Sequence, residues 1–385
     1  MSEWKEYKLG EICDVRDGTH DSPKESPLGY PLVTSKNIKN GVIDLSNTYL
    51  ISESDYNFVN QRSKVEQWDV LFSMIGTIGE CAIVKEQPNY AIKNVGLFKT
   101  DGNRLLSEWI YYYFHSQQAK NEINACLKGS TQQYISLTDL RNFPIEIPSN
   151  EDQHKIVSIL TSLDDKIDIL RRENATLEAM AETLFRQWFV VEAKEDWEEG
   201  KLGDWVVIKR GGSPRPINDY LSPTGYRWLK ISDVTNLNSP YIFQTKEYIK
   251  ENGLSKTVYL KEGSLVLSNS ATPGIPKILC IDSCIHDGWL YFPKSTFSKI
   301  YLYLLFKYIR NDLVNLGNGS IFTNLKTDLL KEYKVDKPDA KTLESFDHHV
   351  QPIFDKLYSN DIQIKTLIQT RDGLLPRLMD GEIKV

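Results

Sequence analysis

The sequence predicts an α/β (α+β) protein in which two globular domains alternate with two long helices. One unit of about 190 residues occurs twice in the chain of 385 residues, and each copy ends in a segment with a coiled-coil pattern. We expect globular domains at 1–149 and 193–338, and helices at 150–192 and 339–385. Domains of ordinary size fit this division, since roughly 150 residues make one domain.

Short matching segments define the repeat. Trp4-Lys-Glu-Tyr-Lys-Leu-Gly10 matches Trp197-Glu-Glu-Gly-Lys-Leu-Gly203 at an offset of 193, and Gly129-Ser130 matches Gly319-Ser320 at an offset of 190. From there the offset of 190 holds without a gap to the end of each copy, whereas the globular parts drift between 190 and 196. The helices are therefore the constant part of the repeat.

Apolar residues in each helical segment alternate at spacings of four and three, which is the seam of a coiled coil. The first seam holds Ile156, Leu160, Leu163, Ile167, Leu170, Leu177, Ala181, Leu184 and Trp188, with Asn174 in the remaining slot. The second holds Phe346, Val350, Ile353, Leu357, Ile364, Leu367, Leu374 and Leu378, with Asn360 and Arg371 in the others. A single Asn in a seam typically sets its register.

Helix boundaries and the mixed character of the globular parts follow from local signals. Ser149-Asn150 and Asp339 are capping residues at the two helix starts, and Asp380-Gly381 is a C-terminal stop. Runs rich in β-branched and aromatic residues predict strands, and longer aromatic runs predict helices. The expected strands are Val33–Ile38, Val70–Met74 and Tyr90–Phe98, and the expected helices are Leu105–Ser116 and Ile300–Leu316.

Composition points to a cytoplasmic protein. No run of about 18 apolar residues is present, the N-terminus lacks a signal-peptide core, and five cysteines suit reduced thiols better than a disulfide framework. The net charge of −6 divides into −4 for 1–149, −4 for 150–193, +4 for 194–338 and −2 for 339–385. A DNA-binding protein needs a local basic surface rather than a positive net charge, so the net charge neither supports nor excludes DNA binding.

Motifs for catalysis are missing from the sequence. It has no phosphate-binding GxxxxGK[ST] loop, no Asn-Pro-Pro-aromatic segment and no glycine-rich turn for S-adenosylmethionine. Cys280, Cys284 and His286 lack a second pair of metal ligands, so a structural role is favoured. We expect a chain that is not an enzyme, with neither a metal nor a cofactor of its own.

Several segments resemble the specificity subunits of type I restriction–modification enzymes. They are Gly129 to Leu140 running into Phe143-Pro-Ile-Glu-Ile-Pro148, the helix end Leu184-Phe-Arg-Gln-Trp-Phe189, the hairpin Asp69 to Gly79, and the C-terminal Arg371 to Glu382. The resemblance covers nearly the whole chain. The second copy departs from it at Ser270 to Pro276 and at Ala340-Lys341-Thr342.

This resemblance implies two target recognition domains related by a pseudo-twofold axis, with the two helices packed antiparallel between them. Each domain would read one half of a split sequence in double-stranded DNA. Two methyltransferase subunits would dock on the helices and bind S-adenosylmethionine, and restriction–translocase subunits would use ATP and Mg. Candidate docking residues are Arg171, Arg172, Arg186, Trp188 and Phe189. The alternative is solvated surface for the arginines and packing against the other helix or a domain for the two aromatic residues.

Base readout needs amides, hydroxyls and basic side chains on loops, backed by phosphate contacts. In the first domain these are Arg16, Thr19, His20, Ser35, Lys36, Asn37, Lys39, Ser73, Thr77, Thr131, Gln132 and Gln133. In the second they are Lys209, Arg210, Ser213, Arg215, Lys230, Ser268, Asn269, Thr272, Thr323, Asn324 and Lys326. Because the loops of the two copies differ most, we expect an asymmetric target with an uncontacted gap.

Two other functions stay open at this point. One is a self-contained DNA methyltransferase or nuclease with unusual motifs, which methyl transfer by the purified chain would reveal. The other is a coiled-coil adaptor without a DNA role, which a failure to bind DNA even beside methyltransferase subunits would favour.

Overall fold

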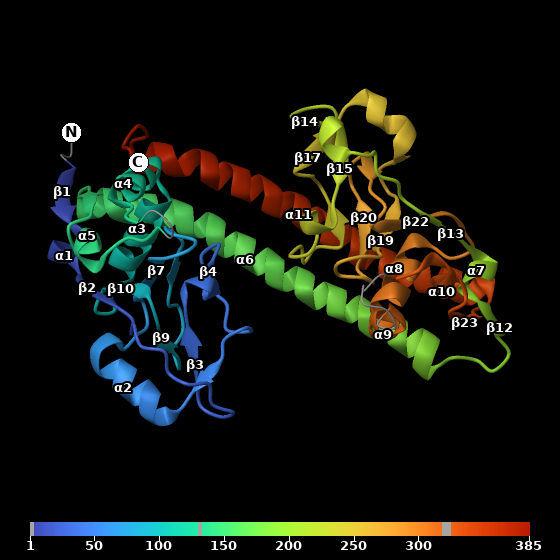
Figure 1. The fold of residues 1–385 in the computed structure, drawn as a ribbon, viewed down its shortest axis with the longest axis horizontal. Coiled ribbons are helices and arrows are strands. Elements are labelled where there is room, and N and C mark those ends of the chain that lie inside the picture. Colours follow the sequence, from blue (N-terminus) through green and yellow to red (C-terminus); the bar gives the residue numbers. More distant parts are fainter. Residues whose placement is uncertain (1–3, 130–132, 318–324) are drawn as a thin grey trace. The chain divides into compact units, whose positions relative to one another are not determined.

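The computed structural model describes residues 4–129, 133–317 and 325–385. The chain divides into two compact units: unit 1 comprises Met1–Ile167 and Thr366–Val385, and unit 2 comprises Asp168–Lys365. Each unit contains one globular part and one portion of each long helix (Figure 1). Within the described residues, no helix is long and apolar enough to cross a membrane.

The two long helices are α6 (Asn150–Arg186) and α11 (Ala340–Met379), and α6 continues as one π-helical turn over Gln187–Val191. Both helices start at the capping residues expected from the sequence. The Ser149 hydroxyl accepts a hydrogen bond from the Asp152 amide at 3.2 Å, and Asp339 accepts one from the Thr342 amide at 2.9 Å. Gly381, just past α11, has a φ of +68°, the left-handed conformation of a C-terminal stop.

In unit 1 a four-stranded antiparallel sheet of order β2-β10-β7-β8 lies at the centre. Strand residues alternate between its faces: Val70 and Phe72 pack against α3, and Leu71 packs against the sheet β6-β3-β9. The elements are β1 (Lys5–Lys8), α1 (Leu9–Ile12), β2 (Asp14–Asp17), β3 (Tyr30–Val33), β4 (Ile38–Lys39), β5 (Val42–Ile43), β6 (Leu50–Ile51), α2 (Glu53–Ser63), β7 (Val70–Ser73), β8 (Cys81–Ile83), β9 (Ala91–Ile92), β10 (Val95–Lys99), α3 (Arg104–His115), α4 (Gln117–Cys126), α5 (Leu137–Arg141) and β11 (Pro144–Ile147).

Unit 2 repeats this plan with two five-stranded sheets, β13-β22-β19-β20-β16 and β14-β17-β15-β21-β18. Leu265 and Leu267 face the core that contains α8, and Val266 faces the opposite core. The elements are β12 (Glu198–Lys201), α7 (Leu202–Trp205), β13 (Val206–Arg210), β14 (Leu221–Ser222), β15 (Tyr226–Leu229), β16 (Tyr241–Ile242), β17 (Glu247–Ile249), β18 (Val258–Leu260), β19 (Leu265–Ser268), β20 (Pro276–Leu279), β21 (Ser283–Ile285), β22 (Trp289–Ser295), α8 (Lys299–Tyr308), α9 (Arg310–Gly317), α10 (Thr327–Lys331) and β23 (Lys334–Lys337).

Several expected elements are broken by turns. The strand expected over Val33–Ile38 is wrong, because β3 ends at Val33 and Ser35–Asn37 form a 3-10 turn. Tyr90–Phe98 divides into β9 and β10, since Asn94 takes a positive φ of 53°. The helix expected over Ile300–Leu316 divides at Ile309 into α8 and α9.

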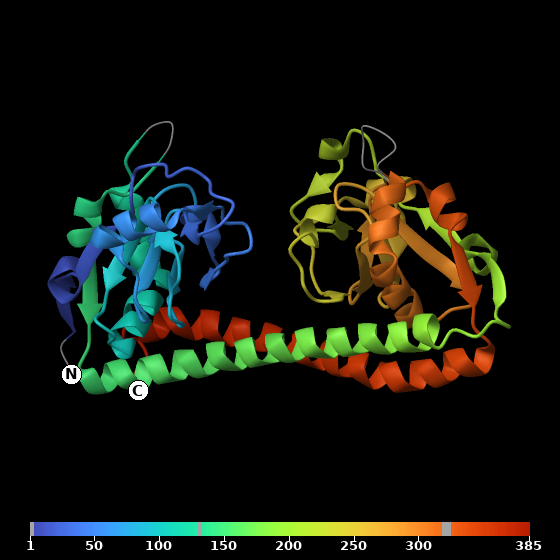
Figure 2. The ribbon, with the colours of Figure 1, turned by 90° about the horizontal axis from the view of Figure 1, so that it is seen from below.

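The helices pair antiparallel within each unit (Figure 2). In unit 1 Asp164 of α6 meets Arg371 of α11 at 2.7 Å. In unit 2 the Asn360 amide donates to the Asn174 side chain at 2.8 Å, so the polar slots of the two seams lie opposite each other. Trp188 and Phe189, for which docking and packing against the other helix were both open, pack against Phe346 of α11, with ring centroids 5.8 and 4.7 Å away.

Candidate nucleic-acid interface

Strand pairing in unit 1 brings four loops to one edge of the central sheet. Asp17 at the end of β2 lies opposite Gly96 of β10, and Ser73 at the end of β7 lies opposite Val95. Val33 at the end of β3 pairs with Ile92 of β9. The loops 18–22, 34–37 and 74–79 and the turn 93–94 therefore open side by side, and we call this set edge 1.

Three predicted residues of edge 1 gather around the turn 93–94. His20 Nδ1 lies 2.8 Å from Asn94 Oδ1, and the Ser35 hydroxyl donates to the Asn94 carbonyl at 3.2 Å. The Thr19 amide donates to the Ile92 carbonyl at 3.1 Å. Gly18 is required here because a Cβ at its position would lie 2.5 Å from the Ile92 carbonyl oxygen.

The other predicted residues of the first domain are either buried within the domain or exposed on its surface. Asn37 is buried and donates to the Asp44 carbonyl at 3.0 Å, and the fully buried Ser73 donates to the Ile75 carbonyl at 3.2 Å. Their side chains are therefore occupied within the domain. Exposed positions are Lys36, Lys39, Thr77 and Gln133, while Thr131 and Gln132 lie outside the described residues.

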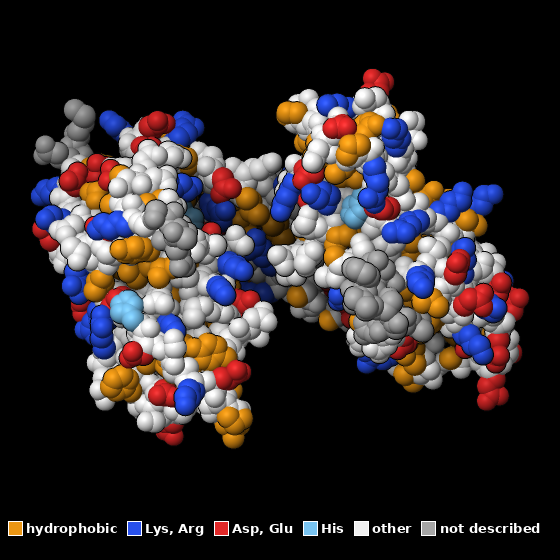
Figure 3. Space-filling model, in the orientation of Figure 1, with side chains coloured by type: hydrophobic (Ala, Val, Ile, Leu, Met, Phe, Trp, Pro, Cys, Tyr) orange, Lys and Arg blue, Asp and Glu red, His pale blue; other side chains and the backbone are white. Residues whose placement is uncertain are grey.

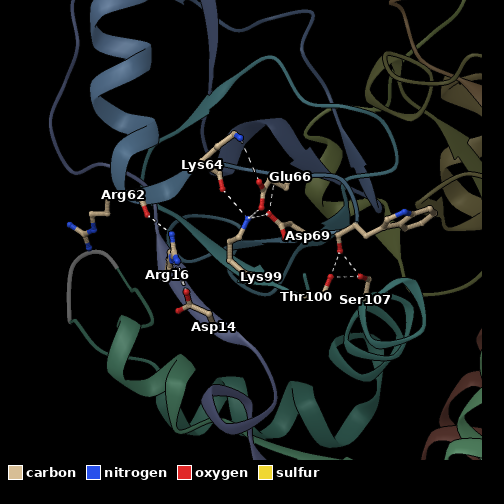
Figure 4. A network of polar contacts seen from close by, with 10 residues as sticks. Asp14, Arg16, Arg62, Lys64, Glu66, Asp69, Lys99, Thr100 and Ser107 are labelled. Atoms are coloured by element: carbon tan, nitrogen blue, oxygen red, sulfur yellow. Dashed lines mark hydrogen bonds and ion pairs between the residues drawn. The ribbon is translucent and has the colours of Figure 1, made fainter. Parts of the chain in front are cut away.

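Arg62 of α2 also faces edge 1, and the sequence analysis did not identify it. Its guanidinium forms an ion pair with Asp17, whose side chain is 4% exposed, and Asp17 also contacts His20 Nε2 at 2.9 Å. Arg16 does not join this group, because it bonds Asp14 at 2.7 Å and the Arg62 carbonyl at 3.1 Å (Figure 4).

A polar network at the far end of β10 holds the segment that follows α2 (Figure 4). The buried Lys99 ammonium donates to Glu66 at 2.6 Å, to Asp69 at 2.9 Å and to the Lys64 carbonyl at 3.2 Å. Burial alone would lower the pKa of Lys99, but the hydrogen bonds to the two carboxylates raise it. The ammonium thus stays charged and anchors the chain just after Arg62.

Unit 2 contains an equivalent edge. Arg210 at the end of β13 lies opposite Leu290 of β22, and Ser268 at the end of β19 lies opposite Trp289. Leu229 of β15 pairs with Ile285 of β21. The loops 211–216, 230–235, 269–275 and 286–288 therefore meet, and we call this set edge 2.

Asp287 is the centre of edge 2. Its carboxylate accepts hydrogen bonds from the Ser213 hydroxyl at 2.7 Å and from Arg215 at 3.2 Å, and its carbonyl accepts one from Arg210 Nε. Burial alone would raise the pKa of Asp287, but the Ser213 hydrogen bond and the nearby arginines lower it. The carboxylate is therefore ionised at neutral pH and orients three of the predicted residues.

The remaining predicted residues of the second domain are likewise either buried within the domain or at its surface. Ser268 and Asn269 are buried and bond the Thr272 and Asp287 carbonyls at 2.6 and 3.3 Å. Lys230 pairs with Glu247 at 2.7 Å. Lys209 and Lys326 are exposed, and Thr323 and Asn324 lie outside the described residues.

Two loops of each edge match at the offset of 193, since loop 18–22 corresponds to 211–215 and the turn 93–94 corresponds to 286–287. His20 and Asn94 correspond to Ser213 and Asp287, and each pair is hydrogen-bonded, at 2.8 and 2.7 Å. Gly18 corresponds to Gly211, where a Cβ would lie 2.2 Å from the His286 carbonyl oxygen. This offset, known from the N-terminal repeat, was the signal by which Asn94 and Asp287 could have been found. The framework is shared, and the side chains that it presents differ.

Exposed basic side chains lie at both edges, among them Lys36 and Arg62 at edge 1 and Arg215 at edge 2. Figure 3 shows Lys and Arg side chains spread among uncharged polar surface on the visible face of each unit.

No group of three potential metal ligands occurs among the residues that the structure describes. Burial raises the pKa of both Cys280 and Cys284 to about 12, so these thiols stay protonated at neutral pH.

Comparison with known proteins gives a consistent result. The family described as "Type I restriction modification DNA specificity domain" matches residues 1–179 and 194–370. The MjaIX specificity subunit of Methanocaldococcus jannaschii is 24% identical over all of this chain and 94% of its own length, and the HindI specificity subunit of Haemophilus influenzae is 25% identical over both full lengths. The crystal structure of the type I restriction–modification S subunit from M. genitalium has the same fold, with a TM-score of 0.60 and 17% identity over 98% of this chain and 96% of that one.

Proposed function

The chain belongs to the family of type I restriction–modification DNA specificity subunits, and from this premise we propose that edges 1 and 2 each read one half of a split DNA target. The chain is then a recognition subunit rather than a catalytic one. The observation that carries the proposal is the pair of loop sets, built on matching strand ends and presenting different side chains. A shared framework accounts for one docking geometry, and the different side chains account for an asymmetric target.

The recognition domains of this proposal are 1–149 and 193–338. The exposed rim residues, such as Lys36, Lys39, Lys209 and Lys326, would contact phosphates and set the orientation on the duplex. Residues whose side chains are hydrogen-bonded to a neighbouring loop, such as His20 and Ser213, would face the bases. The buried Asn37, Ser73, Ser268 and Asn269 are left out of the proposed contacts.

The helices 150–192 and 339–385 would form the scaffold for the catalytic subunits. Exposed apolar side chains on α6, among them Ile159, Ile169 and Met180, offer apolar area for docking. Two methyltransferase subunits would bind there and supply S-adenosylmethionine, and restriction subunits would supply ATP and Mg. This chain would provide the sequence preference of the whole complex.

A domain exchange tests the proposal. Residues 1–149 are replaced by the corresponding domain of another specificity subunit, and the complex with its methyltransferase subunits is expressed in cells. Sequencing of methylated adenines should show a change in one half-site only. A matched exchange of 193–338 should change only the other half-site, and a change in both half-sites from either exchange would contradict the modular reading.

A further inference from the structure

We propose that Arg62 and Arg215 each read a guanine, one in each half-site, and that Asp17 and Asp287 orient them for this task. The inference rests on the proposed function and adds the residues and the base. Neither Asp17 nor Asp287 needs to touch DNA, so both are positioning residues.

At edge 1 the buried carboxylate of Asp17 forms an ion pair with the exposed guanidinium of Arg62. The Asp17 side chain is 4% exposed, whereas that of Arg62 is 60% exposed. Among the described residues, Asp17 is the only side chain to which Arg62 donates, through Nη2. The other guanidinium N–H groups remain available, and a planar fork of such donors matches the O6 and N7 acceptors of guanine in the major groove.

Edge 2 has a similar acid–arginine pair built from different elements, with a more exposed acid, since the Asp287 side chain is 37% exposed. Asp287 receives Arg215 Nη2 at 3.2 Å, and the Ser213 hydroxyl fixes the carboxylate at 2.7 Å. The Arg215 side chain is 79% exposed. Arg62 lies on helix α2 and Arg215 lies in a loop, so the two arginines do not occupy corresponding positions of the repeat.

The pairing favours base reading over phosphate binding. An arginine whose charge is already balanced by a carboxylate attracts phosphates less than a free lysine does, and Lys36 and Lys39 are exposed on the same domain. A carboxylate contact instead limits the rotamers of a long side chain, which raises the directional precision of its remaining donors. Bidentate Arg–guanine contact is the commonest specific contact in the major groove.

The first test is Arg62→Lys, which keeps the charge and removes the fork. In the complex with the methyltransferase subunits, sequencing of methylated adenines should show one G·C position of one half-site relaxed, with the preference for G falling at least about fivefold. Arg215→Lys should relax one G·C position of the other half-site. The matched control is Arg104→Lys, since Arg104 pairs with Glu108 at 2.7 Å near the far end of the same sheet, and it should leave the motif unchanged.

The second test uses the unaltered protein and modified DNA. The probe carries 7-deazaguanine, which lacks the N7 acceptor, at the position identified above. The wild-type complex should bind this probe at least about fivefold more weakly than the normal one, and the Arg62→Lys complex should show a smaller difference between the two probes, because lysine lacks the planar pair of donors. An equal loss in both complexes would overturn the assignment of Arg62.

Asp17→Asn tests the positioning role. It should relax the same base pair as Arg62→Lys, and the double variant should be no worse than Arg62→Lys alone, because both changes act on one contact. A half-site without G·C pairs, or an unchanged motif in the lysine variants, would overturn this inference and leave the proposed function intact. A wild-type complex that methylates no split sequence would overturn both.

Discussion

Lys277 shows how a single residue can link a recognition domain to a helix. It lies on β20, is 4% exposed, and donates to the carbonyls of Leu237 and Ser239, the former at 2.7 Å. The Ser239 hydroxyl in turn donates to Asp361 of α11 at 2.5 Å. Burial lowers the pKa of Lys277 to about 8, although Glu178 and Asp361 oppose the shift and Lys307 and Arg310 add to it.

Stability should therefore depend on pH through Lys277. Its pKa is lower in the folded than in the unfolded chain, so the unfolded chain binds more protons between about pH 8 and 10.5 and stability rises across that window. Compared with Lys277→Met, the wild type should gain at most about 3 kcal/mol in free energy of unfolding between those limits. Denaturant titrations at several pH values measure this, and Lys294→Met, at an exposed position, should track the wild type.

At the scale of elements, the polar slots of the seams set how the helices pair. In unit 2 Asn360 is fully buried and donates to Asn174 at 2.8 Å and to Glu173 at 3.0 Å. Asn174 donates onward to Asp361 at 2.9 Å. A register slip would place these amides against apolar seam residues and leave them without partners, which disfavours other alignments.

Removing one amide should therefore destabilise unit 2. Asn174→Ala leaves Asn360 with one acceptor fewer and should lower the free energy of unfolding by about 1–3 kcal/mol. The double variant Asn174→Leu with Asn360→Leu should recover that loss, since apolar pairs at such slots usually stabilise a coiled coil. Denaturant-induced unfolding gives the comparison, with the exposed Thr176→Ala on the same helix as control. A double variant weaker than Asn174→Ala would refute this account.

For the whole molecule, the continuity of the helices is the feature with the widest consequence. α6 has 37 residues and α11 has 40, and both contribute to each compact unit. In the proposed function these helices determine how far apart the two half-sites lie on DNA.

Lengthening both helices by one heptad should therefore lengthen the gap in the target. Seven residues inserted after Ile167 and seven after Lys365 preserve the seam and add about 10 Å, or about three base pairs. The methylated motif should show the longer gap with unchanged half-sites. Inserting four residues into α6 alone breaks the seam and should change the gap or abolish methylation. A heptad variant that methylates the original motif would show that the helices do not set the spacing.

Sequence patterns predicted the elements that depend on near neighbours. The Ser149 and Asp339 caps and the Gly381 stop rest on interactions within a few residues, and the four-three seam repeats along a single segment, so each could be predicted, and the structure confirms each of them. The same patterns failed over Val33–Ile38, because a β-branched run does not reveal the turn that the Asn37 side chain stabilises.

The candidate edges were only partly predictable. Loop composition pointed to His20, Ser213 and Arg215, which do meet other loops, but it did not separate them from the buried Asn37 and Ser73. Burial depends on what packs above a residue, and composition does not contain that information.

By itself, the sequence determined the repeat, the two helices and their registers, because a periodic seam is read along one segment. Only the tertiary structure decided which loops share an edge and which acid pairs with which arginine. Asp17 meets Arg62 and His20, and Asp287 meets Ser213, because strands distant in the chain pair in a particular order. Such order arises from the packing of the whole domain, so it leaves no local pattern to read.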